Sequence, residues 1–143
     1  MADDAQHILV LDDSDVIGLL ARMTLESEGY KVHVCKTIPQ AVAELQKQSF
    51  ELIILDYNLQ NGEVGFDLFR HLDVLCHKTP NNCLNNEWPI IIMLSAENDP
   101  QRKEMARDNG VKAWVTKPFS PRGIITLVHK LIDEKKAANH ANT

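Results

Sequence analysis

The sequence predicts one α/β domain, with a five-stranded parallel sheet that is doubly wound and carries helices on both faces. Short runs of Ile, Leu and Val without polar alternation indicate strands that are buried on both faces. These runs alternate with helical patterns about five times, which favours right-handed βαβ crossovers. A length of 143 residues, 44% of them hydrophobic and 24% charged, suits a single domain with its own core.

Four of the five expected strands end in reactive side chains. The strands are expected near residues 7–12, 31–35, 51–56, 90–95 and 112–116. Their ends carry Asp12 and Asp13, then Asp56, then Ser95, and finally Lys117. Because the carboxyl ends of parallel strands meet at one edge of a sheet, three acids, a hydroxyl and an ammonium group are expected in one crevice.

Five helices are expected between and after these strands. Helix one begins after Ser14 or Asp15 and stops at Gly29, helix four begins at Asn98 or Asp99, and the others cover about 38–48, 66–75 and 121–133. The apolar stripe expected on helix one consists of Val16, Leu19, Leu20, Met23 and Leu25. Helix four has a thin apolar face, essentially Met105 and Ala106. On helix five, an exposed Ile125 or Ile132 would add an apolar surface patch.

The expected domain covers residues 7–133, between an N-terminal tail (1–6) and a polar, frayed C-terminal tail (134–143). Residues 76–88 are rich in turn-forming residues and longer than a usual connection, which predicts a surface insertion. Cys76, His77 and Cys83 in this insertion lack the paired spacing of a metal site, so solvated loop residues are favoured.

Composition and charge narrow the class of partner. A net charge of -5 gives no basic stripe for nucleic acid or for an anionic membrane surface, so proteins are the expected partners. No apolar stretch approaches the roughly 18 residues that span a bilayer, and no secretory signal follows Met1, which together predict a cytoplasmic protein. Three cysteines without a framework spacing are expected to be reduced thiols.

In order and spacing, the strand-end motifs resemble the receiver domain of two-component response regulators. The motifs are Asp12-Asp13, Asp56, Ser95-Ala96 and Lys117-Pro118-Phe119, and the resemblance covers about residues 7–133. It implies a flavodoxin-like sheet with strand order 2-1-3-4-5. It also implies a cis peptide bond between Lys117 and Pro118.

The resemblance implies that Asp56 is the nucleophile that forms an aspartyl phosphate. Three crowded carboxylates repel one another unless a cation lies among them, and Mg²⁺ prefers oxygen ligands. By resemblance, Asp13 and Asp56 would bind Mg²⁺ directly, the Asn58 backbone carbonyl would contribute, and Asp12 would act partly through water. Lys117 would neutralise charge on the transferred group.

The same resemblance implies a switch, in which Ser95 donates a hydrogen bond to the phosphoryl group. An aromatic residue on the last strand then turns inward, and Trp114 occupies that position; simple packing of this larger indole is an equal alternative. Asn58 and Glu97 match positions that tune loss of the phosphoryl group, although both also suit a solvated surface. The loop Asn58–Gly65 departs from the family because it is one residue longer and has Gln60 in place of a proline.

The expected function is therefore that of a phosphorylation-competent receiver, which is not an enzyme beyond its own phosphotransfer and autodephosphorylation. It would take a phosphoryl group from a sensor histidine kinase or phosphotransfer protein and signal to a downstream protein through helix four, strand five and helix five. A monomer or a weak, phosphorylation-dependent dimer is expected. No effector segment is seen after Asp133, so output by protein contact is expected.

Other interpretations remain beside this one. The chain could be a phosphorelay shuttle, or a receiver cut from a larger regulator. Asp13-Ser14-Asp15 also resembles the nucleophile motif of haloacid-dehalogenase-type phosphohydrolases, which form an aspartyl phosphate on Mg²⁺ too. That motif should continue into a Gly-Thr pair, whereas Val16-Ile17 follow here.

Overall fold

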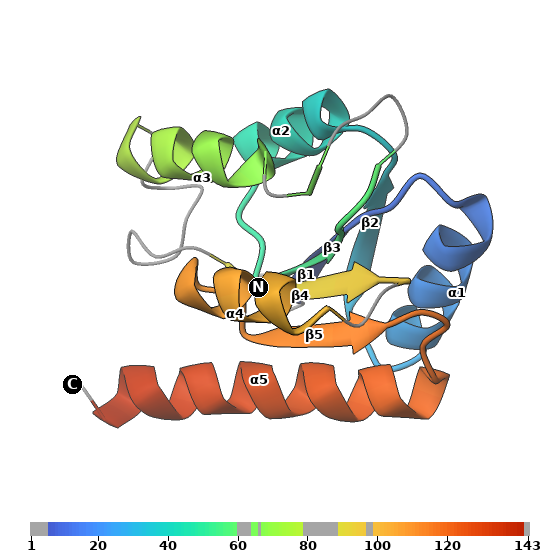
Figure 1. Cartoon of the computed structure of the whole chain (residues 1–143). Coiled ribbons are helices and arrows are strands. Elements are labelled where there is room, and N and C mark those ends of the chain that lie inside the picture. Colours follow the sequence, from blue (N-terminus) through green and yellow to red (C-terminus); the bar gives the residue numbers. More distant parts are fainter. Residues whose placement is uncertain (1–5, 60–63, 66, 79–88, 97–98, 142–143) are drawn as a thin grey trace.

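The computed structural model describes residues 6–59, 64–65, 67–78, 89–96 and 99–141, in which five parallel strands form one sheet (Figure 1). The strands are β1 (His7–Leu11), β2 (Lys31–Cys35), β3 (Leu52–Asp56), β4 (Ile90–Ser95) and β5 (Ala113–Thr116). Their spatial order is β2-β1-β3-β4-β5, which confirms the doubly wound α/β prediction. Each expected strand agrees with the observed one to within one residue at either end.

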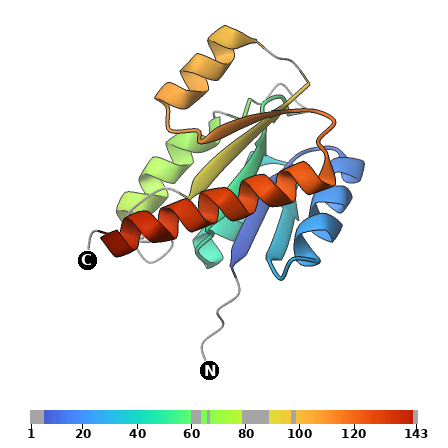
Figure 2. The same cartoon turned by 90° about the horizontal axis from the view of Figure 1, so that it is seen from below.

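Five helices connect or follow the strands and cover both faces of the sheet. They are α1 (Asp15–Glu26), α2 (Ile38–Lys47), α3 (Asp67–Lys78), α4 (Pro100–Asp108) and α5 (Pro121–Ala141). Helices α1 and α5 lie together against one face, as the view in Figure 2 shows, and α2, α3 and α4 cover the other. The two faces therefore have separate apolar cores, as expected for strands that are buried on both sides.

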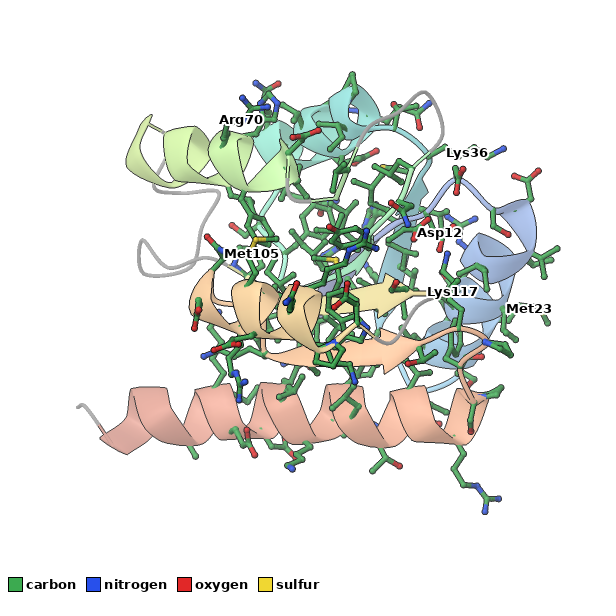
Figure 3. The ribbon with its side chains drawn as sticks, viewed as in Figure 1. Asp12, Met23, Lys36, Arg70, Met105 and Lys117 are labelled. Carbon is green, nitrogen blue, oxygen red and sulfur yellow. The ribbon has the colours of Figure 1, made fainter. Side chains whose placement is uncertain are left out.

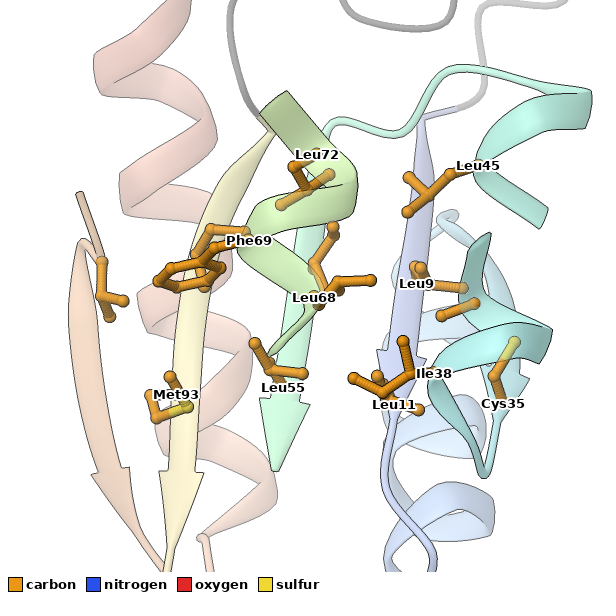
Figure 4. Packing of buried hydrophobic residues seen from close by; sticks show 14 of the residues in the cluster. Leu9, Leu11, Cys35, Ile38, Leu45, Leu55, Leu68, Phe69, Leu72 and Met93 are labelled. Atoms are coloured by element: carbon orange, nitrogen blue, oxygen red, sulfur yellow. The ribbon is translucent and has the colours of Figure 1, made fainter. Parts of the chain in front are cut away.

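The core beneath α2 and α3 is packed from the side chains that the helical spacing indicated. Leu68, Phe69 and Leu72 of α3 and Leu45 of α2 are buried against Leu9 and Leu55 of the sheet (Figure 4). The central strands β3 and β4 are buried along their whole length. Such a sheet cannot shift easily, because each strand packs on both faces, so it holds the side chains at the strand ends in place.

The expected stripe of α1 is wrong for three of its five residues. Val16, Leu19 and Met23 are 73%, 59% and 63% exposed, and Met23 points away from the sheet in Figure 3. The buried residues of α1 are Gly18, Ala21, Thr24 and Leu25. Small residues face the sheet because α1 lies very close to β2: a Cβ at Gly18 would stand 2.7 Å from Val34 Cγ1. Close approach, rather than side-chain hydrophobicity, sets which face is buried.

Two expectations about α4 and α5 also need correction. The expected apolar face of α4 consists of Met105 and Ala106. Ala106 is buried, but Met105 is 45% exposed. On α5, Ile132 is buried and Ile125 packs against the core, so neither forms the expected exposed patch. The predicted frayed tail from residue 134 is instead helical to Ala141. The helix extends past the buried Ile132 because Glu134, Lys135, Lys136 and Ala137 are good helix formers.

A side-chain bridge joins α5 to the turn between α1 and β2. The buried Tyr30 hydroxyl lies 2.7 Å from His129 Nδ1, and His129 Nε2 lies 3.0 Å from Glu28 Oε1. A neutral imidazole protonated on Nε2 satisfies both contacts, since it donates to Glu28 and accepts from Tyr30. Burial raises the pKa of Tyr30, with Asp133 and Glu28 adding to the effect, so the phenol remains a donor.

Replacing His129 with alanine is expected to lower the free energy of unfolding by about 1–3 kcal/mol, because the Tyr30 hydroxyl loses its acceptor inside the fold. Urea denaturation followed by circular dichroism measures this change. The matched control is His71→Ala on α3, where the histidine is exposed, and a change below about 0.5 kcal/mol is expected there. Equal losses in the two variants would show that the bridge contributes no stability.

Candidate functional site

The site lies at the carboxyl edge of the sheet, where β1, β3, β4 and β5 end. Figure 3 shows Asp12 and Lys117 side by side at this edge. Lys117 Nζ lies 2.9 Å from Asp12 Oδ2 and 3.1 Å from Asp56 Oδ1. The structure thus brings together the acids and the ammonium group that the sequence placed at separate strand ends, and one lysine bridges two buried carboxylates.

The turn between β1 and α1 fixes the Asp12 carboxylate. Ser14 N donates to Asp12 Oδ1 over 2.9 Å, and the Ser14 hydroxyl caps α1 by accepting from Ile17 N. Asp12 Oδ2 is fully buried, and Lys117 Nζ at 2.9 Å compensates its charge. No other described group donates to this oxygen, which leaves room in its coordination for another cation or the water bound to it.

Asp56 is 3% exposed at the end of β3. Its Oδ1 accepts a hydrogen bond from Asn58 N over 3.3 Å. Burial, followed by the charge on Asp12, raises the pKa of Asp56, whereas Lys117 and the Asn58 amide lower it, and the net result is a pKa of about 6. The carboxylate is therefore harder to ionise than usual in the metal-free protein.

The charge of Lys117 is held by its two neighbours. Burial by itself would lower the Lys117 pKa, but the Asp12 and Asp56 carboxylates outweigh burial and raise it. The backbone at Lys117 is tied to the end of β4, because Lys117 N donates to Ser95 O over 2.8 Å. The peptide bond between Lys117 and Pro118 is cis, as the resemblance implied. Lys117 therefore remains cationic at the centre of the acids.

Asp12, Asp13 and Asp56 form a set that fits a hard cation. One carboxylate oxygen from each lies within 4.8 Å of the others, and this is the single group of three or more potential ligands found in the described part of the chain. Oxygen donors carrying several negative charges around one point match the preference of Mg²⁺. The buried Asp12 Oδ2, to which no described group other than Lys117 donates, supports the same interpretation.

The remaining expected site residues have different positions. Ser95 is 1% exposed at the end of β4, beside the bridge, whereas Asn58 is exposed and pairs through its backbone with Val64. Trp114 is half-buried on β5, with its ring centroid 5.6 Å from that of Tyr57. Glu97 and Gln60 lie outside the described residues, as do the side chains of Cys76, His77 and Cys83.

Two residues that sequence reasoning missed shape the site. Tyr57, directly after Asp56, is buried against Trp114, and the Arg102 guanidinium of α4 lies 4.9 Å above its ring. Gly65 returns the chain to the strand end, where its N–H donates to Tyr57 O over 2.8 Å. A Cβ at Gly65 would stand 2.4 Å from Asp56 O, so only glycine fits. The sequence signal that could have identified Gly65 was its position at the end of the expected loop Asn58–Gly65.

The raised pKa of Asp56 predicts a pH-dependent stability difference between the wild type and Asp56→Asn in EDTA. A folded pKa of about 6 lies above the usual 3.8, so the folded state binds this proton more tightly than the unfolded chain does. The resulting stability is fully present below about pH 4 and is lost as pH rises through about 6. Urea denaturation should show Asp56→Asn gaining on the wild type across that window, and a constant difference would contradict the assignment.

No helix in the described part of the chain is both long enough and apolar enough to cross a membrane.

The family model for the response regulator receiver domain matches residues 8–129. Among curated proteins, the transcriptional regulatory protein ResD of Bacillus subtilis is 29% identical over 135 residues, covering 94% of this chain and 51% of ResD. The phosphate regulon transcriptional regulatory protein PhoB of Pseudomonas aeruginosa is 32% identical over 118 residues, covering 82% of this chain and 48% of PhoB.

The chain thus spans about half the length of these curated relatives. A solved structure of a CheY-like response regulator receiver domain protein from Methanospirillum hungatei has a TM-score of 0.75 and 22% identity, covering 94% of this chain and 99% of that one. That likeness shows the shared fold. The family model covers all four strand-end motifs, which excludes the haloacid-dehalogenase alternative. This chain therefore belongs to the response regulator receiver domain family.

Proposed function

We propose that the chain is a phosphorylation-competent receiver, which accepts a phosphoryl group on Asp56 with the help of Mg²⁺. The observation that carries the proposal is the bridge of Lys117 Nζ between Asp12 and Asp56, beside the three-carboxylate set. Asp12, Asp13, Asp56 and the Asn58 carbonyl would hold Mg²⁺, which supplies charge neutralisation when bound. The domain acts as a signalling module rather than as an enzyme on other substrates.

The donor is a phosphohistidine on a sensor histidine kinase or a phosphotransfer protein. An Asp56 carboxylate oxygen forms a bond to phosphorus while the bond from phosphorus to the imidazole nitrogen breaks, and the imidazole leaves and gains a proton. Lys117 offsets the negative charge that this transfer adds to a buried position. Ser95, buried beside the bridge, supplies a hydroxyl for the phosphoryl oxygens. Asn58 and Glu97 tune the later attack of water.

The exposed apolar residues of α1 support docking of the donor at this edge. Val16, Leu19 and Met23 are exposed on α1, the helix that follows Asp12 and Asp13 in the sequence, and together they give it an apolar outer surface. The downstream protein binds the face formed by α4, β5 and α5, where α4 has Ala106 as its buried residue and can shift at low cost. Trp114, which contacts Tyr57, connects the site to this face. Its side chain either turns inward on phosphorylation, as a switch, or simply packs in place. We place this signalling in the cytoplasm.

The test is incubation with Mg²⁺ and acetyl phosphate, followed by intact mass and peptide mapping. One added phosphoryl group on Asp56 is expected in the wild type and none in Asp56→Asn, because no other described carboxylate combines burial, the lysine bridge and the centre of the edge. Asp15→Asn, which changes an exposed acid nearby, should label like the wild type. Labelling that persists in Asp56→Asn would contradict the proposal. Onward transfer from Asp56 to a histidine protein would identify a phosphorelay shuttle.

A further inference from the structure

We propose that the groove between α4 and β5 binds an acidic segment of a partner protein and seats an apolar side chain of that segment. The groove has a volume of about 250 Å³. Lys103 and Arg107 of α4 line it together with Lys112 and Trp114, and the buried residues of the lining are Ala106 and Val111. The proposal names the class of partner for the face of α4, β5 and α5 and in that respect rests on the function proposed above, as does the coupling of the groove to phosphorylation.

The described residues that line the groove include three cations and no acid. Lys103, Arg107 and Lys112 form no ion pair with any residue that the structure describes, although Arg102 in the same helix pairs with Asp99 over 3.5 Å. The whole chain has a net charge of -5, so three cations that line one groove are a local reversal of sign. An anionic partner would relieve their mutual repulsion and would be steered to this place.

The sequence of α4 separates its charges by face. Lys103 and Arg107 are four residues apart and both line the groove. Glu104 and Asp108 are also four residues apart, and neither lines it. Because residues four apart share one side of a helix, the basic pair and the acidic pair occupy adjacent sides. The cationic groove therefore has two sources: the charge pattern of α4, and the position of Lys112 and Trp114 on the other side of the groove.

The dimensions favour a peptide over a nucleic acid. The nine residues of α4 extend about 13 Å, which is the length of roughly four residues of an extended chain. Nucleic acid binding usually requires a longer basic track, because affinity grows with the number of neutralised phosphates. Ala106, Val111 and the half-buried indole of Trp114 instead offer an apolar surface between the charges. Acidic side chains flanking one apolar side chain match this arrangement.

A chain of contacts connects the groove to the phosphoacceptor. Trp114 lines the groove and stacks at a tilt of 48° against Tyr57, which is the residue after Asp56. The Arg102 guanidinium of α4 lies over the Tyr57 ring. A rearrangement at Asp56 that moves Tyr57 would thus change the aromatic side of the groove. We therefore expect the affinity for the acidic segment to differ between the two states of Asp56.

The experiment uses a short synthetic peptide in which glutamates flank a single central leucine, titrated into the nitrogen-15-labelled chain. Amide shifts are expected at residues 103–114, and a peptide with glutamine for glutamate should bind at least about tenfold more weakly. Lys103→Gln combined with Arg107→Gln should weaken the acidic peptide by a similar factor. The matched control, Lys47→Gln on α2 with Arg70→Gln on α3, removes two exposed charges from helices that do not form this face and should change affinity less than about twofold.

Three outcomes would overturn the groove proposal: equal binding of the two peptides, shifts centred elsewhere, or tighter binding of an oligothymidylate of equal charge. The titration is then repeated with Mg²⁺ and beryllofluoride, a phosphoryl mimic. If beryllofluoride shifts the amides around Asp56 and the acidic peptide still does not bind, the groove proposal fails alone. If the peptide binds and beryllofluoride has no effect at Asp56, the receiver function fails and the groove stands. An unchanged peptide affinity despite a response at Asp56 would overturn the coupling.

Discussion

Lys117→Met is expected to lower the free energy of unfolding of the metal-free protein by about 3 kcal/mol, because it leaves two buried carboxylates without their common cation. Lys117 Nζ lies within 3.1 Å of both Asp12 and Asp56, and its side chain is 20% exposed. Methionine keeps most of the side-chain volume, so the lost charge accounts for most of the effect. Urea denaturation at neutral pH in EDTA measures it.

Two further variants identify the cause of that loss. Lys36→Met breaks the ion pair with Asp15 at the surface, where both side chains are more than half exposed, and should cost less than about 1 kcal/mol. Adding Asp56→Asn to Lys117→Met should restore part of the lost stability, since it removes one of the stranded charges. Mg²⁺ should do the same for the single variant. Equal effects of Lys117→Met and Lys36→Met would show that the bridge does not stabilise the fold.

Asp13→Ala is expected to weaken Mg²⁺ binding by at least about tenfold, since it removes one of three charged oxygen ligands. Its carboxylate belongs to the set whose oxygens lie within 4.8 Å of one another. The fold should persist, and its stability in EDTA should stay equal or rise as repulsion among the acids is relieved. Isothermal titration with Mg²⁺ gives the affinity, and denaturation in EDTA gives the stability.

Asp15→Ala is the matched control for this variant. It removes an acid two residues further along, which pairs with Lys36 and is not part of the carboxylate set. Magnesium affinity should therefore match that of the wild type. If Asp13→Ala and Asp15→Ala bind Mg²⁺ equally well, the affinity reflects general negative charge and the proposed ligand set is wrong.

The sequence predicted the sheet and its reactive edge well, for a simple physical reason. A strand buried on both faces must be apolar throughout, so its ends are marked by the first polar residues, here Asp12, Asp56 and Ser95. Parallel strands then bring those residues to one edge. Strand order came from resemblance instead, because an apolar run does not show which neighbour it pairs with.

The helices show where pattern reasoning failed. Hydrophobicity placed Val16, Leu19 and Met23 in the core, yet Gly18 and Ala21 occupy the buried side because α1 approaches Val34 closely. On α5, the polar residues after Asp133 hid a helix that continues to Ala141. The error on α1 arises because burial is decided by the distance between elements, and a single segment does not encode the position of its neighbour. The error on α5 arises because Glu134, Lys135, Lys136 and Ala137 are good helix formers even though they add no apolar stripe.

The sequence by itself determined the fold class, the strand ends and the types of group that meet there, since these follow from local apolar runs and their polar boundaries. Only the tertiary structure decided that Lys117 bridges Asp12 and Asp56, that Gly65 must pass close to Asp56 O, and that Tyr57 connects Trp114 with Arg102. The lysine and aromatic contacts join segments far apart in the chain, and all three features depend on strand order, twist and helix position, which are fixed when the two cores pack together.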